Sequence, residues 1–157
     1  MVKKELLEFE ENILSSNFEK AFEISKQMSS EEIQERLYAI AEKKMETSLP
    51  YNMSAYAYVM SVLIKEETPE YHLLAADLMT TQYLPLPNAC EVALWHSRRA
   101  LRLKPDSKKA AGMIVFLYLH EETSATKEEY ENALKIVQDW LLQIRAKGRI
   151  YWLTKTL

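Results

Sequence analysis

The sequence predicts an all-α protein, and three observations lead to that prediction. Only 2 of the 157 residues are glycine, whereas average usage of roughly 7% would give about 11. Because β-hairpin turns commonly need glycine, this shortage disfavours an all-β fold. Apolar residues recur at helical spacing, and no stretch shows the two-residue alternation of a half-buried strand. Residues that begin and end helices recur at regular intervals.

In chain order, the predicted helices span residues 3–15, 17–28, 30–46, 52–66, 69–82, 89–104, 107–121 and 127–147. The first places Leu6, Phe9 and Ile13 on one face, as an amphipathic helix does. The second and third are predicted from capping boxes, in which a serine and a glutamate bond each other's backbone N–H groups. These boxes are Ser16 with Glu19 and Ser29 with Glu32.

Prolines and polar caps bound the later helices. Pro50 ends the third predicted helix, and Pro85 and Pro87 separate the fifth from the sixth. Gly148 is expected to end the last helix. The caps predicted for the fifth to eighth helices are Thr68 before Pro69, Asn88 with Glu91, Ser107 after Pro105, and Thr126 with Glu129.

Short connections predict that consecutive helices lie antiparallel, as four hairpins. The second helix of each hairpin carries an alanine in a similar place, and a small residue there lets two helices approach closely. Ala21, Ala57, Ala93 and Ala133 are separated by 36, 36 and 40 residues, and taking Ala55 for Ala57 gives 34, 38 and 40. This repeat favours a stacked solenoid, with a closed helical bundle as the alternative.

Residues 91–106, EVALWHSRRALRLKPD, resemble the second helix and terminating turn of a tetratricopeptide repeat. Ala93 and Ala100 lie seven residues apart, and Pro105 follows five residues later. The next helix also fits the pattern, so the best match covers residues 89–120. The resemblance implies one tetratricopeptide-like domain over residues 1–157, a right-handed α-solenoid of about four hairpins. The first helices of the hairpins would line a concave groove that binds a protein or peptide.

Carried over to the best-matched unit, the resemblance assigns Lys109, Gly112, Phe116 and His120 to that groove. A basic cluster lies beside them and offers Arg98 and Arg102 as further contacts to an acidic partner; its six cations are Arg98, Arg99, Arg102, Lys104, Lys108 and Lys109. Nucleic acid is a weaker hypothesis for this cluster, because no aromatic residues alternate with the cations to stack on bases. The formal net charge of −3 also disfavours it.

The same residues argue against an enzyme, a metal site and a cofactor. The two isolated glycines cannot form a phosphate-binding loop or a nucleophile elbow. His72, His96 and His120 form no pair at ligand spacing within one helix, and we expect them to be ordinary, partly exposed side chains. A single cysteine, Cys90, cannot form an intrachain disulfide. With no signal peptide and no membrane span in the sequence, we expect a cytoplasmic protein.

The favoured function is therefore a non-enzymatic interaction module that binds a protein or peptide through a concave helical face. The alternative is a small bacterial-type regulatory or immunity protein that masks one specific partner with its charged surface. In the C-terminal tail, residues 148–157, Trp152 and Leu153 are expected to cap the last hairpin or to form a dimer contact. Both a monomer and a homodimer remain open.

Overall fold

The structure, a computed structural model, describes residues 3–43, 52–120 and 123–146, with side chains described up to residue 139. These residues form eight helices and no strand, which confirms the all-α prediction. The helices are α1 (Lys3–Leu14), α2 (Phe18–Ser25), α3 (Ser30–Glu42), α4 (Ser54–Lys65), α5 (Pro69–Thr81), α6 (Ala89–Leu103), α7 (Lys108–Tyr118) and α8 (Lys127–Ala146). Trp152, Leu153 and Gly148 lie outside the described residues.

Four of the six predicted helix caps are present. The Ser29 hydroxyl accepts the Glu32 N–H while the Glu32 carboxylate accepts the Ser29 N–H, which completes a capping box. Thr126 and Glu129 form the same reciprocal pair at the start of α8. Single caps are provided by Thr68, which accepts the Tyr71 N–H, and by Ser107, which accepts the Ala110 N–H.

The other two caps were wrongly predicted, and each involves a residue in the left-handed region. Ser16 has φ 60° and Asn17 stands at the start of α2, with no side-chain cap bond. Asn88 has φ 62° and makes no cap bond to α6. A capping side chain reaches the first-turn N–H groups from an extended backbone, so a left-handed Asn88 misses them. Glu91 instead accepts hydrogen bonds from Ser124.

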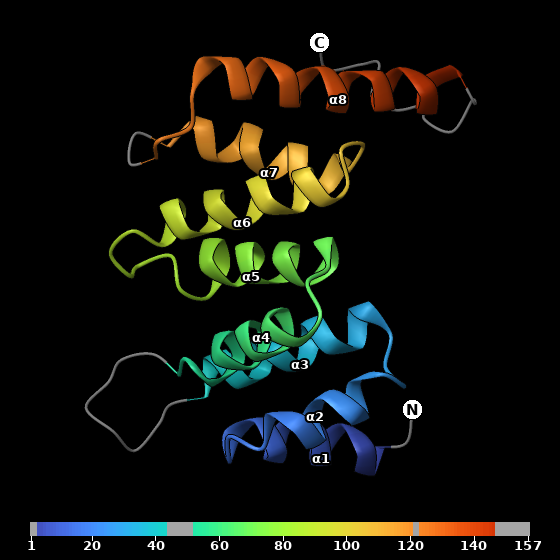
Figure 1. Cartoon of the computed structure of the whole chain (residues 1–157), viewed down its shortest axis with the longest axis vertical. Helices are drawn as coiled ribbons and strands as arrows, with labels where there is room; N and C mark the ends of the chain where they lie inside the picture. Colours follow the sequence, from blue (N-terminus) through green and yellow to red (C-terminus); the bar gives the residue numbers. More distant parts are fainter. Residues whose placement is uncertain (1–2, 44–51, 121–122, 147–157) are drawn as a thin grey trace.

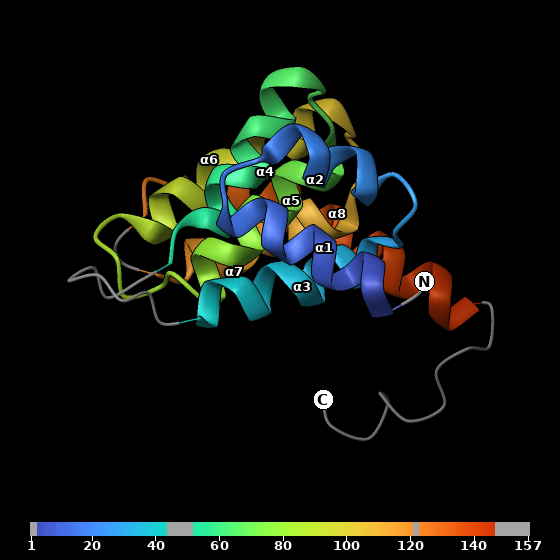
Figure 2. The same ribbon diagram turned by 90° about the horizontal axis from the view of Figure 1, so that it is seen from below.

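The helices follow one another along the long axis of the molecule, with α1 near one end and α8 at the other (Figure 1). Viewed from the α1 end, successive helices overlap one behind another (Figure 2). Most helices pack against their neighbours in the chain, and α5 with α6 is the most extensive pair. None of the described helices is long and apolar enough to cross a bilayer.

Each of the helices α2, α4, α6 and α8 buries a small residue at a similar place. Ala21, Ala55, Ala93 and Ala133 are fully buried, whereas Ala57 is exposed. The buried alanines therefore follow the register with Ala55, at separations of 34, 38 and 40 residues.

An ion cluster around the buried Glu10 joins α1 to α3 and the residue that follows it. Glu10, only 6% exposed, accepts hydrogen bonds from Arg36 Nη1 at 2.9 Å and Lys43 Nζ at 2.6 Å. Burial alone would raise the pKa of Glu10, but the hydrogen bonds from Lys43 and Arg36 outweigh it and lower the pKa below its ordinary value. The contact fixes α3 against α1.

Candidate functional site

A half-open pocket of about 250 Å³ lies where α3, α5 and α7 approach one another. The residues that line the pocket come from all three helices. Three are on α3, four on α5 and one on α7: Ser30, Ile33, Gln34, Glu70, Tyr71, Leu73, Leu74 and Lys109. Ile33 and Leu73 are more than nine-tenths buried and give the pocket an apolar lining. In the series of hairpins expected from the sequence, these are the first helices of the second, third and fourth.

Small residues hold α7 close to α5 at this pocket. Leu73 of α5 packs in one apolar cluster with Ala100 of α6 and Ala110 of α7, and both alanines are fully buried. Larger side chains at these two positions would push α7 away. The alanines thus bring Lys109, next to Ala110 in sequence, to the edge of a pocket formed mainly by α3 and α5.

A polar brace beside the pocket fixes the position of α3 relative to α5. Gln34 Nε2 donates to Asp77 Oδ2 at 2.6 Å, and the Tyr38 hydroxyl donates to the same oxygen. Burial raises the pKa of Tyr38, and its bond to Asp77 adds to this effect, so the phenol keeps its donor proton. Because Gln34 also lines the pocket, the brace fixes the width of the pocket between α3 and α5.

The rim of the pocket carries one charge of each sign. Glu70 and Lys109 are both exposed, and neither forms an ion pair with another residue in the described part of the chain. Pockets for drug-sized ligands typically measure about 300–1,000 Å³. At about 250 Å³, this one is better matched to one or two side chains of a partner, with polar groups at the rim.

Of the four groove residues expected from the sequence, Lys109 lines the pocket. Gly112, Phe116 and His120 follow it at spacings of three and four residues, which continues one face along and just beyond α7. Phe116 is 45% exposed, and the His120 ring meets it edge-on at 4.8 Å between centroids. A Cβ added at Gly112 would meet nothing within 4 Å, so this part of the face is open.

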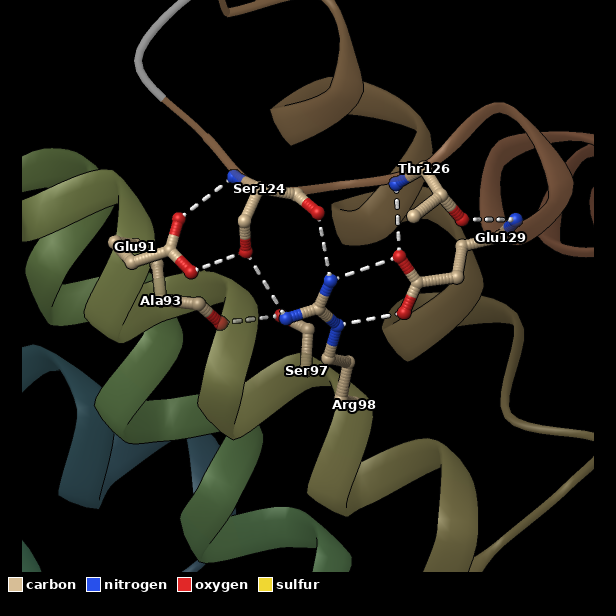
Figure 3. A network of polar contacts seen from close by, with 7 residues as sticks. All are labelled: Glu91, Ala93, Ser97, Arg98, Ser124, Thr126 and Glu129. Carbon is tan, nitrogen blue, oxygen red and sulfur yellow. Dashed lines mark hydrogen bonds and ion pairs between the residues drawn. The ribbon is translucent and has the colours of Figure 1, made fainter.

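The half-buried Arg98 is bound by groups of its own chain. Its Nε and Nη2 donate to the two carboxylate oxygens of Glu129 at 2.6 and 2.8 Å, and Nη2 also donates to the Ser124 carbonyl at 3.0 Å (Figure 3). Glu91 accepts the Ser124 N–H at 2.8 Å. The helix α6 is therefore hydrogen-bonded to the segment that leads into α8 through both Glu91 and Arg98. The Arg98 bonds lower the pKa of Glu129 to about 2.

The basic cluster is therefore partly neutralised by internal ion pairs. Arg99 pairs with Glu67 as Arg98 does with Glu129. Arg102 and Lys104 are exposed and have no ion pair with another described residue. These two side chains and Lys109 leave cationic groups around the α6–α7 turn, whereas Arg98 is left out of the partner site proposed below.

Two of the three histidines are buried and in contact, so the expectation of partial exposure was wrong for them. His72 of α5 is 2% exposed and His96 of α6 is 1% exposed, and their Nδ1 atoms lie 2.8 Å apart. His96 Nε2 lies 2.9 Å from the Tyr56 hydroxyl of α4. His72 Nε2 lies 3.0 Å from Glu67, whose carboxylate also accepts Arg99 Nη2 at 2.7 Å.

This chain of five polar side chains connects α4, α5 and α6 through their interior. Burial and the neighbouring His72 lower the pKa of His96 to about 4. Hydrogen bonds from Arg99 and His72 lower the pKa of Glu67 to about 2, so its carboxylate stays ionised. Trp95, 54% exposed, packs edge-on against both imidazole rings. Within the described residues, no three histidine, cysteine or carboxylate side chains gather as a metal ligand set.

Comparisons of the chain with protein-family models, with curated proteins and with solved structures find no match.

Proposed function

We propose that this chain is a non-enzymatic, tetratricopeptide-like α-solenoid that binds a segment of a partner protein in the groove formed by α3, α5 and α7. The order of the helices along the long axis supports stacked hairpins rather than a bundle around one centre. The buried alanines at similar places in α2, α4, α6 and α8 support a repeated packing unit. Ala93 and Ala100, the pair that carries the resemblance, are both fully buried.

The pocket between α3 and α5, with Lys109 at its edge, is the observation that carries this proposal. Its volume and its apolar lining by Ile33 and Leu73 fit one inserted apolar side chain. Lys109, Arg102 and Lys104 supply unpaired positive charge on the α7 side, among the described residues. The partner segment therefore carries an apolar anchor next to an aspartate or glutamate, and the acidic group lies against Lys109.

Selection from a random 12-residue peptide library on the wild-type protein tests this function. The selected peptides should share an apolar residue next to an acidic one. Lys109→Glu should weaken their binding about tenfold, because an attractive charge contact becomes a repulsive one and tenfold corresponds to about 1.4 kcal/mol. Lys135→Glu changes the net charge equally at an exposed position of α8, which contributes no residue to the pocket, so it is the matched control.

A second pair of variants tests the pocket itself. Ser30 is exposed at the pocket edge, so Ser30→Trp should fill the mouth without disturbing the core, whereas Ser30→Ala leaves it open. Binding should be lost in Ser30→Trp and retained in Ser30→Ala. Equal binding by all four variants would show that the peptides bind elsewhere and would refute the proposed groove.

A further inference from the structure

The hydrogen bonds around His72 and His96 fit one arrangement of protons when both rings are neutral. Ionised Glu67 can only accept, so His72 carries its hydrogen on Nε2 and leaves Nδ1 as an acceptor. His96 must then donate from Nδ1, and its Nε2 accepts the Tyr56 hydroxyl. Every polar atom in this row of hydrogen-bonded side chains then has a partner, and each hydrogen bond is donated in the direction of Glu67.

One added proton can be accommodated in this chain. His72 as an imidazolium faces the Glu67 carboxylate and donates from Nδ1 to His96 Nδ1. His96 then carries its hydrogen on Nε2, and the Tyr56 oxygen accepts it once the hydroxyl hydrogen turns away. The contacts keep their heavy-atom positions, and only the direction of donation between His72, His96 and Tyr56 is reversed.

A second proton cannot be accommodated. Both Nδ1 atoms would carry hydrogens that point at each other across 2.8 Å, on two buried and positively charged rings. A donor facing a donor removes the hydrogen bond, and the like charges repel. We propose that the His72–His96 pair is a proton-operated latch, which holds α4, α5 and α6 together and releases the α5–α6 contact when both rings are protonated.

The charged and titratable groups around the pair keep their charge, so the two histidines are the groups that gain protons. Glu67, in the turn before α5, stays ionised, and Arg99 of α6 is bound to it. On α4 the neighbour is Tyr56, whose pKa is raised by burial, so it remains a neutral phenol. On the other packed faces, Asp77 of α5 faces α3, while Glu91 and Glu129 are engaged by Ser124 and Arg98, as described above.

The latch adjoins the pocket. His72 lies between Tyr71 and Leu73 in α5, and both of these residues line the pocket. Leu73 of α5 packs with Ala100 of α6 and Ala110 of α7, so release of α6 from α5 moves Lys109, at the α7 edge of the groove, away from the walls that α3 and α5 form. Acid is then expected to lower the affinity for the partner segment. That consequence rests on the proposed function, whereas the latch can be tested on the protein alone.

Nitrogen-15 NMR of the imidazole rings, recorded from pH 7.5 to pH 3.5, tests the latch directly. At pH 7.5, His96 should carry its hydrogen on Nδ1, and His72 should carry it on Nε2. His96 should stay neutral in the closed form down to about pH 4, and amide-exchange protection of α5 and α6 should fall between pH 6.5 and pH 4, where the open form binds a proton that the closed form does not. His120, which packs on Phe116, is the internal reference.

Two variants separate the latch from general acid unfolding. His96→Gln keeps a polar side chain that does not titrate, so the step in exchange protection should disappear. Tyr56→Phe removes the oxygen that accepts the Nε2 hydrogen of charged His96, and a bond to a charged ring is stronger than the one that the neutral ring accepts. The lower end of the fall in protection should therefore move down by about half to one pH unit. This variant keeps the packed ring and serves as the test if His96→Gln does not fold.

Three results would overturn the latch: His96 with its hydrogen on Nε2 at pH 7.5, titration of His96 above pH 6 in the folded protein, or an unchanged step in both variants. A selected peptide then measures the coupling to the groove. Its affinity should fall more steeply between pH 6 and pH 4 for the wild type than for His96→Gln. Equal slopes would refute the coupling, whereas a failure to select any peptide would count against the proposed function and leave the NMR result standing.

Discussion

Replacing His96 by glutamine should remove most of the acid sensitivity of this fold between pH 7 and pH 5. The pKa of His96 is about 4 in the folded protein, against an ordinary value of 6.5. Between these values the unfolded chain binds a proton that the folded chain does not, so stability falls as pH falls. The full difference corresponds to about 3 kcal/mol, and about 2 kcal/mol of it should be lost by pH 5.

The carboxylates with lowered pKa values act in a different window. Glu10, Glu67 and Glu129 stabilise the folded state above their unfolded pKa of about 4.5, and that contribution is lost as pH falls below it. Between pH 7 and pH 5 they are largely charged in both states. A drop in stability within this range therefore reports on histidine.

Urea unfolding at pH 7 and pH 5 measures the effect on the wild type, His96→Gln and the control His120→Gln. The wild type and the control should lose about 2 kcal/mol of unfolding free energy, and His96→Gln should lose much less. An equal loss in all three proteins would refute the assignment of the acid sensitivity to His96.

Three further predictions test the packing. Ala55→Leu should lower the free energy of unfolding in urea by about 1–3 kcal/mol, because Ala55 is fully buried. Ala57→Leu, at the exposed neighbour, should change it by less than about 0.5 kcal/mol. Equal effects would contradict the repeat register. Gly112→Ala should raise the unfolding free energy by about 0.5–1 kcal/mol, since the added methyl meets open space inside a helix, and a loss would show that the position is strained. Arg98→Met should lower the free energy of unfolding by about 1–3 kcal/mol and increase amide exchange at the start of α8, because Glu129 and Ser124 lose their shared donor. Unchanged exchange there would rule out the anchoring role of Arg98.

Local signals in the sequence predicted most helix boundaries, and contacts between distant segments explain the exceptions. Thr68 and Ser107 cap their own helices as expected, because the bond depends only on neighbouring backbone. Glu91 has capping-box spacing after Asn88, but it bonds Ser124, 33 residues away. The choice between Ala55 and Ala57 also needed the packing, since both have suitable spacing and only one is buried.

The candidate site was predicted in part. Lys109 follows from the resemblance, but Ile33 and Leu73 line the pocket because of how α3 and α5 pack, and no motif records that spacing. His72 and His96 lie on different helices, so ligand spacing within one helix does not reveal their contact. Their midpoint, residue 84, lies in the α5–α6 connection, as expected for residues that face each other across an antiparallel hairpin. This symmetry is the sequence signal that would have paired them.

Backbone amide NMR of the ¹⁵N-labelled protein, titrated with a peptide from the library selection, tests the proposed groove most directly. The largest shift changes should lie in α3, α5 and α7, centred on Ser30, Gln34 and Lys109, and they should be absent in Ser30→Trp. Changes centred on α2, α4 or α8, and retained in Ser30→Trp, would contradict binding through the first helices of the hairpins.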